Sequence, residues 1–441
     1  MLSGIFTSIA SHRNWFIRLL NAGLSLMLII GSIYLPVYKN KVSDLFNSVL
    51  GDKVKINLYA MQSSPDNLEE YKDSVFITTY ALDSENQDYA LSKIREDLET
   101  EIQSIDRPTV YDSVGALYRN EGQILIMAEA YESVIEETEG YENFREDTKI
   151  IATYYRTINT NIKKSDASLT NKPFTIFFGG NDQEGELSLI GRTDVNMLVT
   201  VNPNTHQISI VSVPRDSYIP NPALGYGNDK LTHLGINGIE NTMSGLSNYF
   251  GIPVDHYVLI NFTTYKKIID ALGGIDVYNP YAFRYTWDKN YYFEEGNIHL
   301  DGQAALYYVR ERYTLPDGDF GRNMHQQIVM SAILDKVTSP EVITKFDKLL
   351  SAMKGTFVTD LSDSAIYGIC EKQLDEQVKW NTVRYGVLGT TGGAICAAAP
   401  GQKLSVVFPY ENQVDFVSSV MDNVINGNIM EQQEIPEGVH Y

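Results

Sequence analysis

The chain has 441 residues, 43% of them hydrophobic, and a formal net charge of -21 at pH 7. This length is enough for two or three domains, and the apolar content is typical of a folded chain rather than a disordered one. The acidic balance argues against general binding to nucleic acid or to an anionic membrane surface. A binding site for an anion would therefore have to be a local concentration of basic residues.

The first distinctive segment, residues 19–38, reads LLNAGLSLMLIIGSIYLPVY. About 20 residues without a charge are enough for one membrane-spanning helix. A cleaved signal peptide is the alternative, but the residues around Pro36 offer no clear small-residue cleavage site. Arg13 and Arg18 precede the segment and weakly favour a cytoplasmic N-terminus. The sequence thus predicts a cytoplasmic segment at 1–18, a single uncleaved anchor in the cell membrane, and the bulk of the chain outside the cytoplasm.

Residues 40–165 predict a small α/β domain. KVKINLYAM and VFITTYAL are strand-like, and YALSKIREDLETEIQSI has the periodicity of a helix. The region is rich in Glu and Asp, and it contains no group of residues to which chemistry can be attached. The polar stretch NIKKSDASLTNKP, residues 161–173, predicts the linker to the next domain.

A second domain is expected over residues 173–430. FTIFF, VNMLVTV, QISIVSV and HYVLINF predict strands, and the turn NPNT joins the second to the third. TTYKKIIDALGG predicts a helix that its glycines end. Strands alternating with helices imply a mainly parallel or mixed sheet covered on both faces. In such sheets ligands bind at the strand ends.

Charged residues lie at the predicted strand ends. Asp182 follows the first strand, Arg192 and Asp194 precede the second, and Arg215 follows the third. If these strands are neighbours, the two carboxylates with a few phosphate oxygens suit an octahedral magnesium ion. Simpler explanations stay open: Asp182 can form an Asx turn, Asp194 can pair with Arg192, and Arg215 can pair with Asp216.

The segment ALYYVRERYTLPDGDFGRNMHQQ, residues 305–327, predicts a helix ending near Tyr308, a polar loop and a second helix from about Arg322. Arg310 and Arg312 cannot share a helical face, but in an extended stretch both can point to the same side. The planar fork of arginine suits phosphate oxygens, and the N-terminus of the second helix would add to the attraction. A phosphate or diphosphate is the predicted guest, and a solvated helix face followed by a turn is the alternative.

The two cysteines leave two interpretations. Cys370, in a probable helix, and Cys396, in the Gly/Ala-rich stretch GTTGGAICAAAPG, can form a disulfide that closes a C-terminal loop. Two buried free thiols are the other possibility.

Several stretches occur together in one order: GRTDVNMLVTVNPNTHQISIVSVPRDSYIP, DKLTHL, INFTTYKKIIDALGGIDV, LDGQAALYYVRER and DGDFGRNMHQQ. In this combination the chain resembles the LytR-CpsA-Psr family, most strongly over residues 173–340. The anchor and the extra domain before the catalytic one resemble its capsule-assembly members. The resemblance implies an α/β catalytic domain whose mixed central sheet is flanked by helices on both faces, preceded by a small α/β accessory domain and one transmembrane helix.

The resemblance also implies an activity. Such enzymes are phosphotransferases that move a glycopolymer, such as capsular polysaccharide or teichoic acid, from a polyprenyl diphosphate to a sugar hydroxyl of peptidoglycan. The implied partners are the lipid-linked glycopolymer, peptidoglycan and, through the anchor, the lipid bilayer, with no nucleic acid. Hydrolysis of the polyprenyl diphosphate and non-catalytic binding of the lipid-linked polymer are the alternatives.

Carried onto this sequence, the resemblance assigns residues to roles. Asp182 and Asp194 match the ligands of Mg²⁺, with Mn²⁺ as an alternative metal. The residues that match the diphosphate site are Arg192, Arg215, Arg310, Arg312, Arg322 and Gln326, and Lys230 falls near a basic position of the same pocket. Arg310 and Arg312 are expected to act in catalysis, and Asp319 is the candidate to orient or deprotonate the attacking hydroxyl. His325 stands where family members commonly carry arginine, so a titratable charge is expected in place of a fixed one.

A polyprenyl donor also needs an apolar slot. The helix faces of ALYYV and IVMSAIL are candidates for its wall, although apolar stripes at helical spacing are ordinary core in most proteins.

Overall fold

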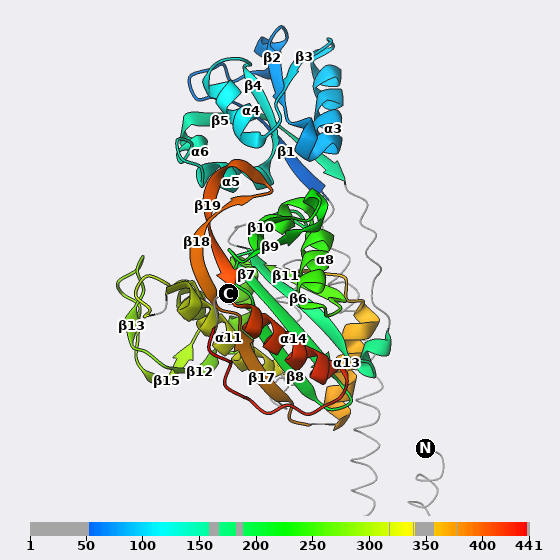
Figure 1. The fold of residues 1–441 in the computed structure, drawn as a ribbon, viewed down its shortest axis with the longest axis vertical. Helices are drawn as coiled ribbons and strands as arrows, with labels where there is room; N and C mark the ends of the chain where they lie inside the picture. Colours follow the sequence, from blue (N-terminus) through cyan, green and yellow to red (C-terminus); the bar gives the residue numbers. More distant parts are fainter. Residues whose placement is uncertain are drawn as a thin grey trace, which may run out of the picture.

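The computed structural model describes residues 53–157, 167–181, 188–316, 318–337, 339, 357–376 and 378–438. These residues form two sheet-containing units, and the N-terminal unit lies at the top of Figure 1. No helix in these ranges is long and apolar enough to cross a membrane. The segment 1–18 and the anchor predicted at 19–38 fall outside the described residues.

The N-terminal unit is a five-stranded sheet with helices against it, and its strand order is β3-β2-β4-β1-β5. β2 runs parallel to β3 and β4, whereas β1 is antiparallel to β4 and β5. Its strands are β1 (Lys53–Met61), β2 (Val75–Thr78), β3 (Gln103–Asp106), β4 (Ile124–Ala128) and β5 (Thr148–Thr157). Its helices are α3 (Tyr80–Leu98), α4 (Val110–Tyr118), α5 (Glu132–Glu136) and α6 (Phe144–Asp147).

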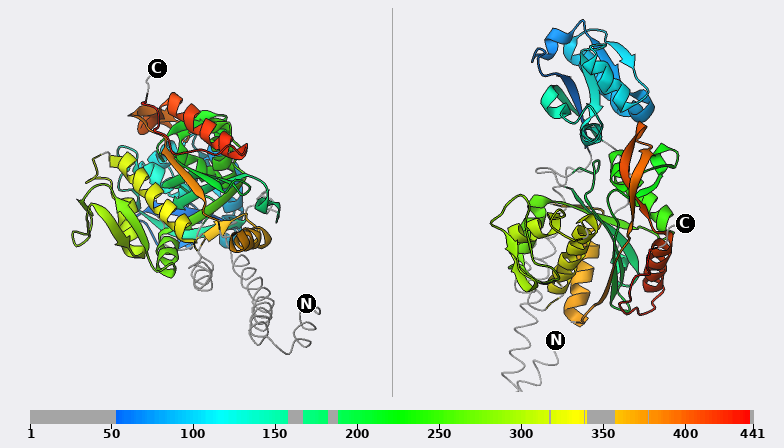
Figure 2. Two further views of the ribbon diagram at one scale, coloured as in Figure 1. Left: turned by 90° about the horizontal axis from the view of Figure 1, so that it is seen from below. Right: turned by 60° about the vertical axis from the view of Figure 1, so that its left-hand side comes forward.

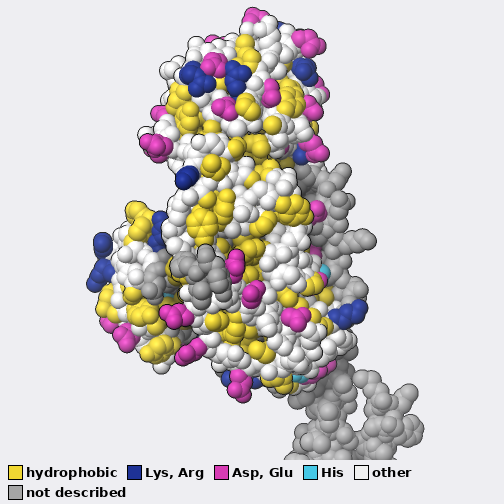
Figure 3. Space-filling view, viewed as in Figure 1, with side chains coloured by type: hydrophobic (Ala, Val, Ile, Leu, Met, Phe, Trp, Pro, Cys, Tyr) yellow, Lys and Arg dark blue, Asp and Glu magenta, His cyan; other side chains and the backbone are white. Residues whose placement is uncertain are grey.

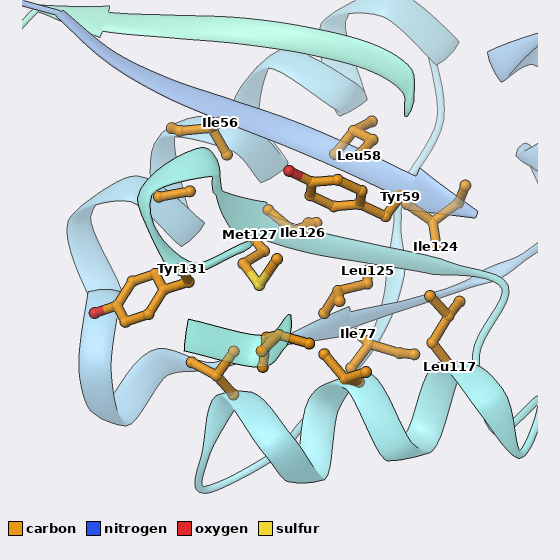
Figure 4. Packing of buried hydrophobic residues seen from close by; sticks show 14 of the residues in the cluster. Ile56, Leu58, Tyr59, Ile77, Leu117, Ile124, Leu125, Ile126, Met127 and Tyr131 are labelled. Carbon is orange, nitrogen blue, oxygen red and sulfur yellow. The ribbon is translucent and has the colours of Figure 1, made fainter. Parts of the chain in front are cut away.

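The core of the N-terminal unit explains why this segment folds as it does. All five residues of β4 are buried, and Figure 4 shows Ile126 of β4 near Ile56 and Leu58 of β1. The strand predicted at 53–61 is confirmed. The helix predicted from Tyr89 through residue 105 is wrong at its end, because α3 stops at Leu98 and residues 103–106 pair with β2 as β3. Pairing with a neighbouring strand has overridden the local helical period.

The second unit contains a six-stranded sheet in the order β16-β11-β6-β7-β8-β17. β6 is parallel to β11 and β8 is parallel to β17, while β7 is antiparallel to both β6 and β8. The sheet is therefore mixed, and the four strands predicted in this region are confirmed. Its strands are β6 (Phe174–Asn181), β7 (Val195–Asn202), β8 (Gln207–Ser212), β11 (His256–Asn261), β16 (Phe357–Thr359) and β17 (Asn381–Gly386).

Helices cover both faces of this sheet, as predicted. Met197 of β7 packs in a cluster with Met330 of α11 (Gly318–Val337), on one face. Its neighbour Leu198 packs on the other face with Leu246 of α8 (Ile239–Phe250) and Val417 of α14 (Glu411–Ile425). Figure 2 shows α11 and α14 on opposite sides of the sheet.

Shorter elements surround the sheet. The helices among them are α7 (Leu231–Leu234), α9 (Phe262–Ala271), α10 (Gly302–Arg310) and α13 (Asp363–Glu376). The strands are β9 (Tyr218–Asn221), β10 (Gly227–Lys230), β12 (Ile275–Asn279), β13 (Phe283–Arg284), β14 (Tyr292–Phe293), β15 (Gly296–Leu300), β18 (Gly389–Cys396) and β19 (Ala399–Pro409). Single-turn 3-10 helices lie at Leu68–Tyr71, Glu129–Tyr131, Ala167–Thr170, Pro222–Leu224 and Gly235–Asn237.

The β18–β19 hairpin joins the two units. It reaches from the second unit to α5 of the N-terminal unit, as Figure 1 shows. Leu404 and Val406 of the hairpin belong to one buried apolar cluster with Val110 and Val134 of the N-terminal unit. The Gly/Ala-rich stretch is thus a strand rather than a loop, and Cys396 at its end is a buried free thiol, so the disulfide alternative is wrong.

Candidate functional site

The carboxyl ends of β6, β8, β11 and β17 meet at one edge of the six-stranded sheet. Asn181 pairs with Asn261 across β6 and β11, and Ser212 pairs with Gly386 across β8 and β17. β7 begins at the same edge, because the backbone N–H of Asp194 donates to the Gly180 carbonyl at 2.7 Å. The segments that carry the predicted strand-end residues are therefore neighbours, which was the condition for the predicted convergence.

Arg215 and Asp194 form the first ion pair at this edge. Arg215 Nη1 lies 2.5 Å from Asp194 Oδ1, and its Nε lies 3.7 Å from Asp216 Oδ2. Burial opposes the charge on Arg215, but the neighbouring carboxylates of Asp194 and then Asp216 outweigh it and raise the pKa of the guanidinium. Asp194 thus pairs with Arg215 rather than with Arg192.

Arg192 is held by a close approach of two backbone segments. Gly191 N donates to the Gly235 carbonyl at 2.9 Å, and a Cβ on Gly235 would lie 2.1 Å from the Gly191 oxygen, so only glycine fits there. Arg192 Nε donates to Thr232 Oγ1 at 3.4 Å. Its Nη2 lies 2.6 Å from Oε1 of Glu137, which belongs to the N-terminal unit.

Lys230 shares that carboxylate. Its Nζ lies 2.7 Å from Glu137 Oε2 and 3.4 Å from Asp216 Oδ1, and its side chain is 6% exposed. Burial alone would raise the pKa of Glu137, but Arg192 and Lys230 lower it to about 2, so the carboxylate is ionised at neutral pH. Glu137 was missed by the sequence analysis, because nothing distinguishes it from the other acidic residues of ESVIEETEG.

Together these residues form a network of three cations and three carboxylates, which we call the edge network. Its members are Arg192, Arg215, Lys230, Glu137, Asp194 and Asp216. On the face of the molecule in Figure 3, basic side chains are few and scattered among acidic ones. The edge network gathers charge at one place, but its cations and carboxylates are equal in number, so it is not by itself the basic cluster that the acidic composition predicts for an anion site.

Arg310 reaches the same edge from another element. It is the last residue of α10, and its guanidinium carbon lies 4.5 Å from the ring centre of Phe262, which directly follows β11. Its guanidinium has no hydrogen-bond acceptor among the described residues. Arg312 lies in the loop beyond, stacked on the Tyr313 ring at 4.6 Å with Nη2 donating to the Tyr313 hydroxyl at 2.6 Å.

Glu311, between the two arginines, organises their loop. It is 1% exposed and accepts backbone N–H groups from Arg312, Tyr313 and Thr314 at 2.9, 2.7 and 3.1 Å. It also accepts the N–H and hydroxyl of Thr286, at 2.6 and 2.9 Å. Burial opposes ionisation, but these hydrogen bonds outweigh it and lower the pKa of Glu311. Nothing in the sequence around Glu311 indicates this role.

Replacing Glu311 with alanine is expected to lower the free energy of unfolding by about 2 kcal/mol, because several buried donors lose their acceptor. Glu311→Gln keeps one acceptor oxygen and should lose less. Urea denaturation measures both, with Glu295→Ala at an exposed position as the control that changes little. An alanine variant as stable as the wild type would show that the loop does not depend on this carboxylate.

The N-terminal half of α11 lies at the same edge. Gln327 Nε2 donates to the Tyr385 carbonyl, at the end of β17, at 2.6 Å. Arg322 and Gln326 are both largely buried, at 8% and 6% exposed. Because α11 begins at Gly318, Arg322 lies one turn inside the helix, and its predicted position at the helix start is wrong.

For the remaining predicted residues, the structure describes only part of the site. Asp182 lies outside the described residues. Asp319 lies in the first turn of α11, and the structure does not describe its side chain. Within the described part of the chain, no hydrogen bond or ion pair joins Arg310, Arg312 or Gln326 to the edge network.

His325 is part of a buried aromatic stack. It is 0% exposed, its ring lies 4.0 Å from that of Tyr308 and 5.1 Å from that of Phe283, and its Nδ1 is 3.0 Å from the Tyr308 carbonyl. Burial lowers its pKa to about 4, against the opposing effect of that hydrogen bond. The imidazole is neutral at pH 7, so the expected titratable charge in the pocket is wrong.

The two helix faces predicted to line an apolar slot differ in their surroundings. On α10, Leu306, Tyr308 and Val309 are buried, so this face is ordinary core. On α11, Ile328 and Ser331 line a groove of about 780 Å³. Ser331 lies nine residues after Arg322, on the opposite side of the helix. Apolar residues, including Val277, Met324 and Ala332, line the groove together with charged ones such as Asp335 and Lys336, so its wall is mixed, and its use by a lipid chain stays a prediction.

One buried cluster has the residue types of a metal site. Asp229, His233 and Cys396 have side-chain atoms within 4.8 Å of one another. The oxygens of Asp229 are already in use, however: Oδ1 accepts from Lys230 N at 2.9 Å and contacts His233 Nδ1 at 2.6 Å, and Oδ2 accepts from Ala398 N at 2.9 Å. The cluster is a hydrogen-bonded hub that fixes Lys230 and ties the hairpin to α7.

The sequence matches a known protein family. Residues 129–407, more than half of the chain, match the family model described as LytR_cpsA_psr family. A protein of Enterococcus faecalis named polyisoprenyl-teichoic acid–peptidoglycan teichoic acid transferase TagU is 36% identical over 242 residues, which are 54% of this chain and 77% of that protein. The protein of the same name from Bacillus anthracis is 34% identical over 207 residues, 46% of this chain and 66% of that one.

One solved structure supports the same fold, and a second is similar to part of the chain. A protein of Streptococcus agalactiae, gbs0355, superposes with a TM-score of 0.50 at 24% identity and covers 63% of this chain and 96% of its own. TagV of B. subtilis gives a TM-score of 0.49 at 26% identity, over 58% of this chain and 98% of its own. The first of these likenesses extends to the fold alone.

Proposed function

Because the chain belongs to the LytR-CpsA-Psr family, we propose that it is a phosphotransferase that moves a glycopolymer from a polyprenyl diphosphate to a sugar hydroxyl of peptidoglycan. The observation that carries the proposal is the gathering of Arg192, Arg215 and Arg310 with Asp194 at one sheet edge. The relatives named for transfer of teichoic acid to peptidoglycan favour teichoic acid or a similar wall polymer over capsular polysaccharide.

In the proposed reaction, the sugar hydroxyl oxygen bonds to the phosphorus that carries the polymer. The bond from that phosphorus to the bridging oxygen breaks, and polyprenyl phosphate leaves with that oxygen. Such a step needs positioning and neutralisation of negative charge more than covalent chemistry. Arg310 suits this role because its guanidinium is uncommitted, and Arg312 offers a second fork beside it. The hydroxyl proton passes to a base, for which Asp319 is the proposed residue.

A magnesium ion fits the residues that are described. Asp194 Oδ1 accepts from Arg215, and Oδ2 has no hydrogen bond or ion pair with a described residue, so one hard oxygen donor stays available. Asp182 would be the second protein ligand. When bound, Mg²⁺ or Mn²⁺ would offset charge on the phosphate oxygens.

The cellular setting belongs to the proposal as well. Residues 19–38 would anchor the chain in the cell membrane with the bulk outside the cytoplasm, where a lipid-borne donor and peptidoglycan are both within reach. In this arrangement the N-terminal unit is the accessory domain that precedes the catalytic one.

In the direct test, the full-length protein is incubated with a polyprenyl-diphosphate glycan, peptidoglycan fragments and Mg²⁺, and the products are identified by mass spectrometry. We expect a phosphate-linked adduct of glycan and peptidoglycan together with polyprenyl phosphate. Removing the metal with EDTA should lower the rate at least tenfold, and added Mg²⁺ should restore it. Water-dependent cleavage without adduct would establish a hydrolase instead, and tight binding without turnover would establish a binding protein.

A further inference from the structure

A carboxylate of the N-terminal unit reaches the edge network of the other unit. Glu137 is the residue that follows α5, and its two oxygens bind separate cations, Arg192 at 2.6 Å and Lys230 at 2.7 Å. The side chains of Arg192 and Lys230 are only 14% and 6% exposed. This is a partly buried contact, and not one of the exposed surface pairs that contribute little.

The position of Glu137 is fixed by the packing around it. α5 lies against the β18–β19 hairpin, as Figure 1 shows, and Val134 of α5 shares a buried apolar cluster with Leu404 and Val406 of the hairpin. Separating the two units would expose this apolar surface to water. Packing of α5 on the hairpin therefore fixes the position of Glu137 at the sheet edge.

The charges around Lys230 indicate what Glu137 does. Lys230 Nζ contacts Glu137 and Asp216, and its backbone N–H is fixed on Asp229, so its positive charge is offset by two carboxylates. It serves as the anchor for Glu137 more readily than as a phosphate ligand. Arg192 differs: Nη2 is bound to Glu137 and Nε to Thr232, while Nη1 forms no hydrogen bond or ion pair with a described residue.

We propose that Glu137 is a positioning residue of the diphosphate site: anchored by Lys230, it holds the guanidinium of Arg192 so that Nη1 is the donor offered to the diphosphate. The inference rests on the proposed function, because it presumes that the edge receives a diphosphate. It gives the N-terminal unit a part in the site, since one side chain of that unit sets the geometry of an arginine in the other. A misplaced donor lowers the rate of phosphoryl transfer, because the reacting groups must be held in a precise geometry.

The alternative is that Glu137 blocks the site. A carboxylate that occupies Arg192 and Lys230 would compete with phosphate oxygens, and its removal would then tighten binding of the donor. The two roles predict changes of opposite sign for the same substitution, so one measurement separates them.

The experiment uses the full-length protein and the variants Glu137→Gln, Arg192→Ala and their combination. Binding of farnesyl diphosphate in the presence of Mg²⁺ is measured by calorimetry, and transfer is measured as above. The matched control is Glu136→Gln, because Glu136 is the neighbouring residue, is similarly exposed at 23% against 27%, and pairs with Arg145 inside the N-terminal unit. Thermal melting checks that every variant is folded.

We expect Glu137→Gln to weaken farnesyl diphosphate binding and to lower kcat/KM for transfer about tenfold, and Glu136→Gln to change neither by more than twofold. In the Arg192→Ala background, Glu137→Gln should have no further effect, since it acts through that arginine. Unchanged or tighter binding in Glu137→Gln, or an equal loss in both backgrounds, would overturn the inference. If the wild type binds farnesyl diphosphate but transfers no polymer, the proposed transferase activity is refuted. The coupling between Glu137 and Arg192 can still be measured from binding in that case. A wild type that does not bind the probe would overturn the inference itself.

Discussion

Replacing Arg310 with alanine is expected to lower the rate of glycopolymer transfer by about 10²- to 10³-fold, the usual loss when one positioned donor to a developing charge is removed. Its guanidinium is exposed and stacks on Phe262, and no described residue accepts a hydrogen bond from it. The fold therefore depends little on this side chain, whereas the site loses its uncommitted positive charge. Initial rates of adduct formation, with thermal melting alongside, measure both effects.

The matched control for Arg310 is Arg284→Ala. Arg284 is also exposed and also stacks on an aromatic ring, that of Tyr292 at 5.0 Å, but it lies in β13 and donates to the Lys289 carbonyl. Its removal should change the transfer rate less than twofold. A near-normal rate in Arg310→Ala would mean that the diphosphate binds elsewhere on the sheet edge.

The part of the site that lies at strand ends was predictable from the sequence. The strands that bring Arg192, Asp194 and Arg215 together carry a clear local apolar pattern, and their order in the chain already places their ends at one edge. The short turn between β7 and β8 fixes the antiparallel pairing that completes this part of the sheet. Local patterns were therefore enough for these three residues.

The residues that support the arginines were not predictable in the same way. Glu137 and Arg192 are 55 positions apart and belong to different units, so their contact depends on how the hairpin packs against α5. Glu311 is adjacent to both arginines of its loop, but its role follows from Thr286 and the turn that folds around it. Both are tertiary contacts of single carboxylates, and an acidic chain offers many equivalent candidates.

Dependence on tertiary packing also explains why the predicted titratable charge at His325 is wrong. Its place in the motif predicts a charged residue of the pocket, whereas its stacking on Tyr308 and Phe283 is decided by the packing of α10 and β13 against α11. A position for which the family resemblance predicts a cation is part of the core in this chain. The positive charge at the sheet edge therefore comes from the arginines and Lys230, without His325.

Burial of His325 is expected to make the protein less stable in mild acid. Its pKa is about 4 in the folded protein and ordinarily 6.5, so below pH 6.5 the unfolded chain takes up a proton that the folded chain does not. The stability linked to this histidine is full above pH 6.5 and falls as the pH drops towards 4, by about 3 kcal/mol over the whole window. Urea denaturation at a series of pH values between 4 and 8 measures the effect.

Other groups titrate in the same window, so the informative quantity is the difference between the wild type and a variant. Asp83, whose pKa burial raises to about 7, acts with the opposite sign, because it holds a proton in the folded state. The variant His325→Phe keeps an aromatic ring in the stack and removes the titrating group. Its stability relative to the wild type should improve by about 3 kcal/mol from pH 7 to pH 4. His299, replaced in the same way, serves for comparison: it pairs with Asp276 at an exposed site, where solvent screens the interaction, so its replacement should change the difference much less. A difference that stays constant with pH in His325→Phe would mean that the folded protein admits a charged imidazole at this position, and that the pocket keeps a titratable cation after all.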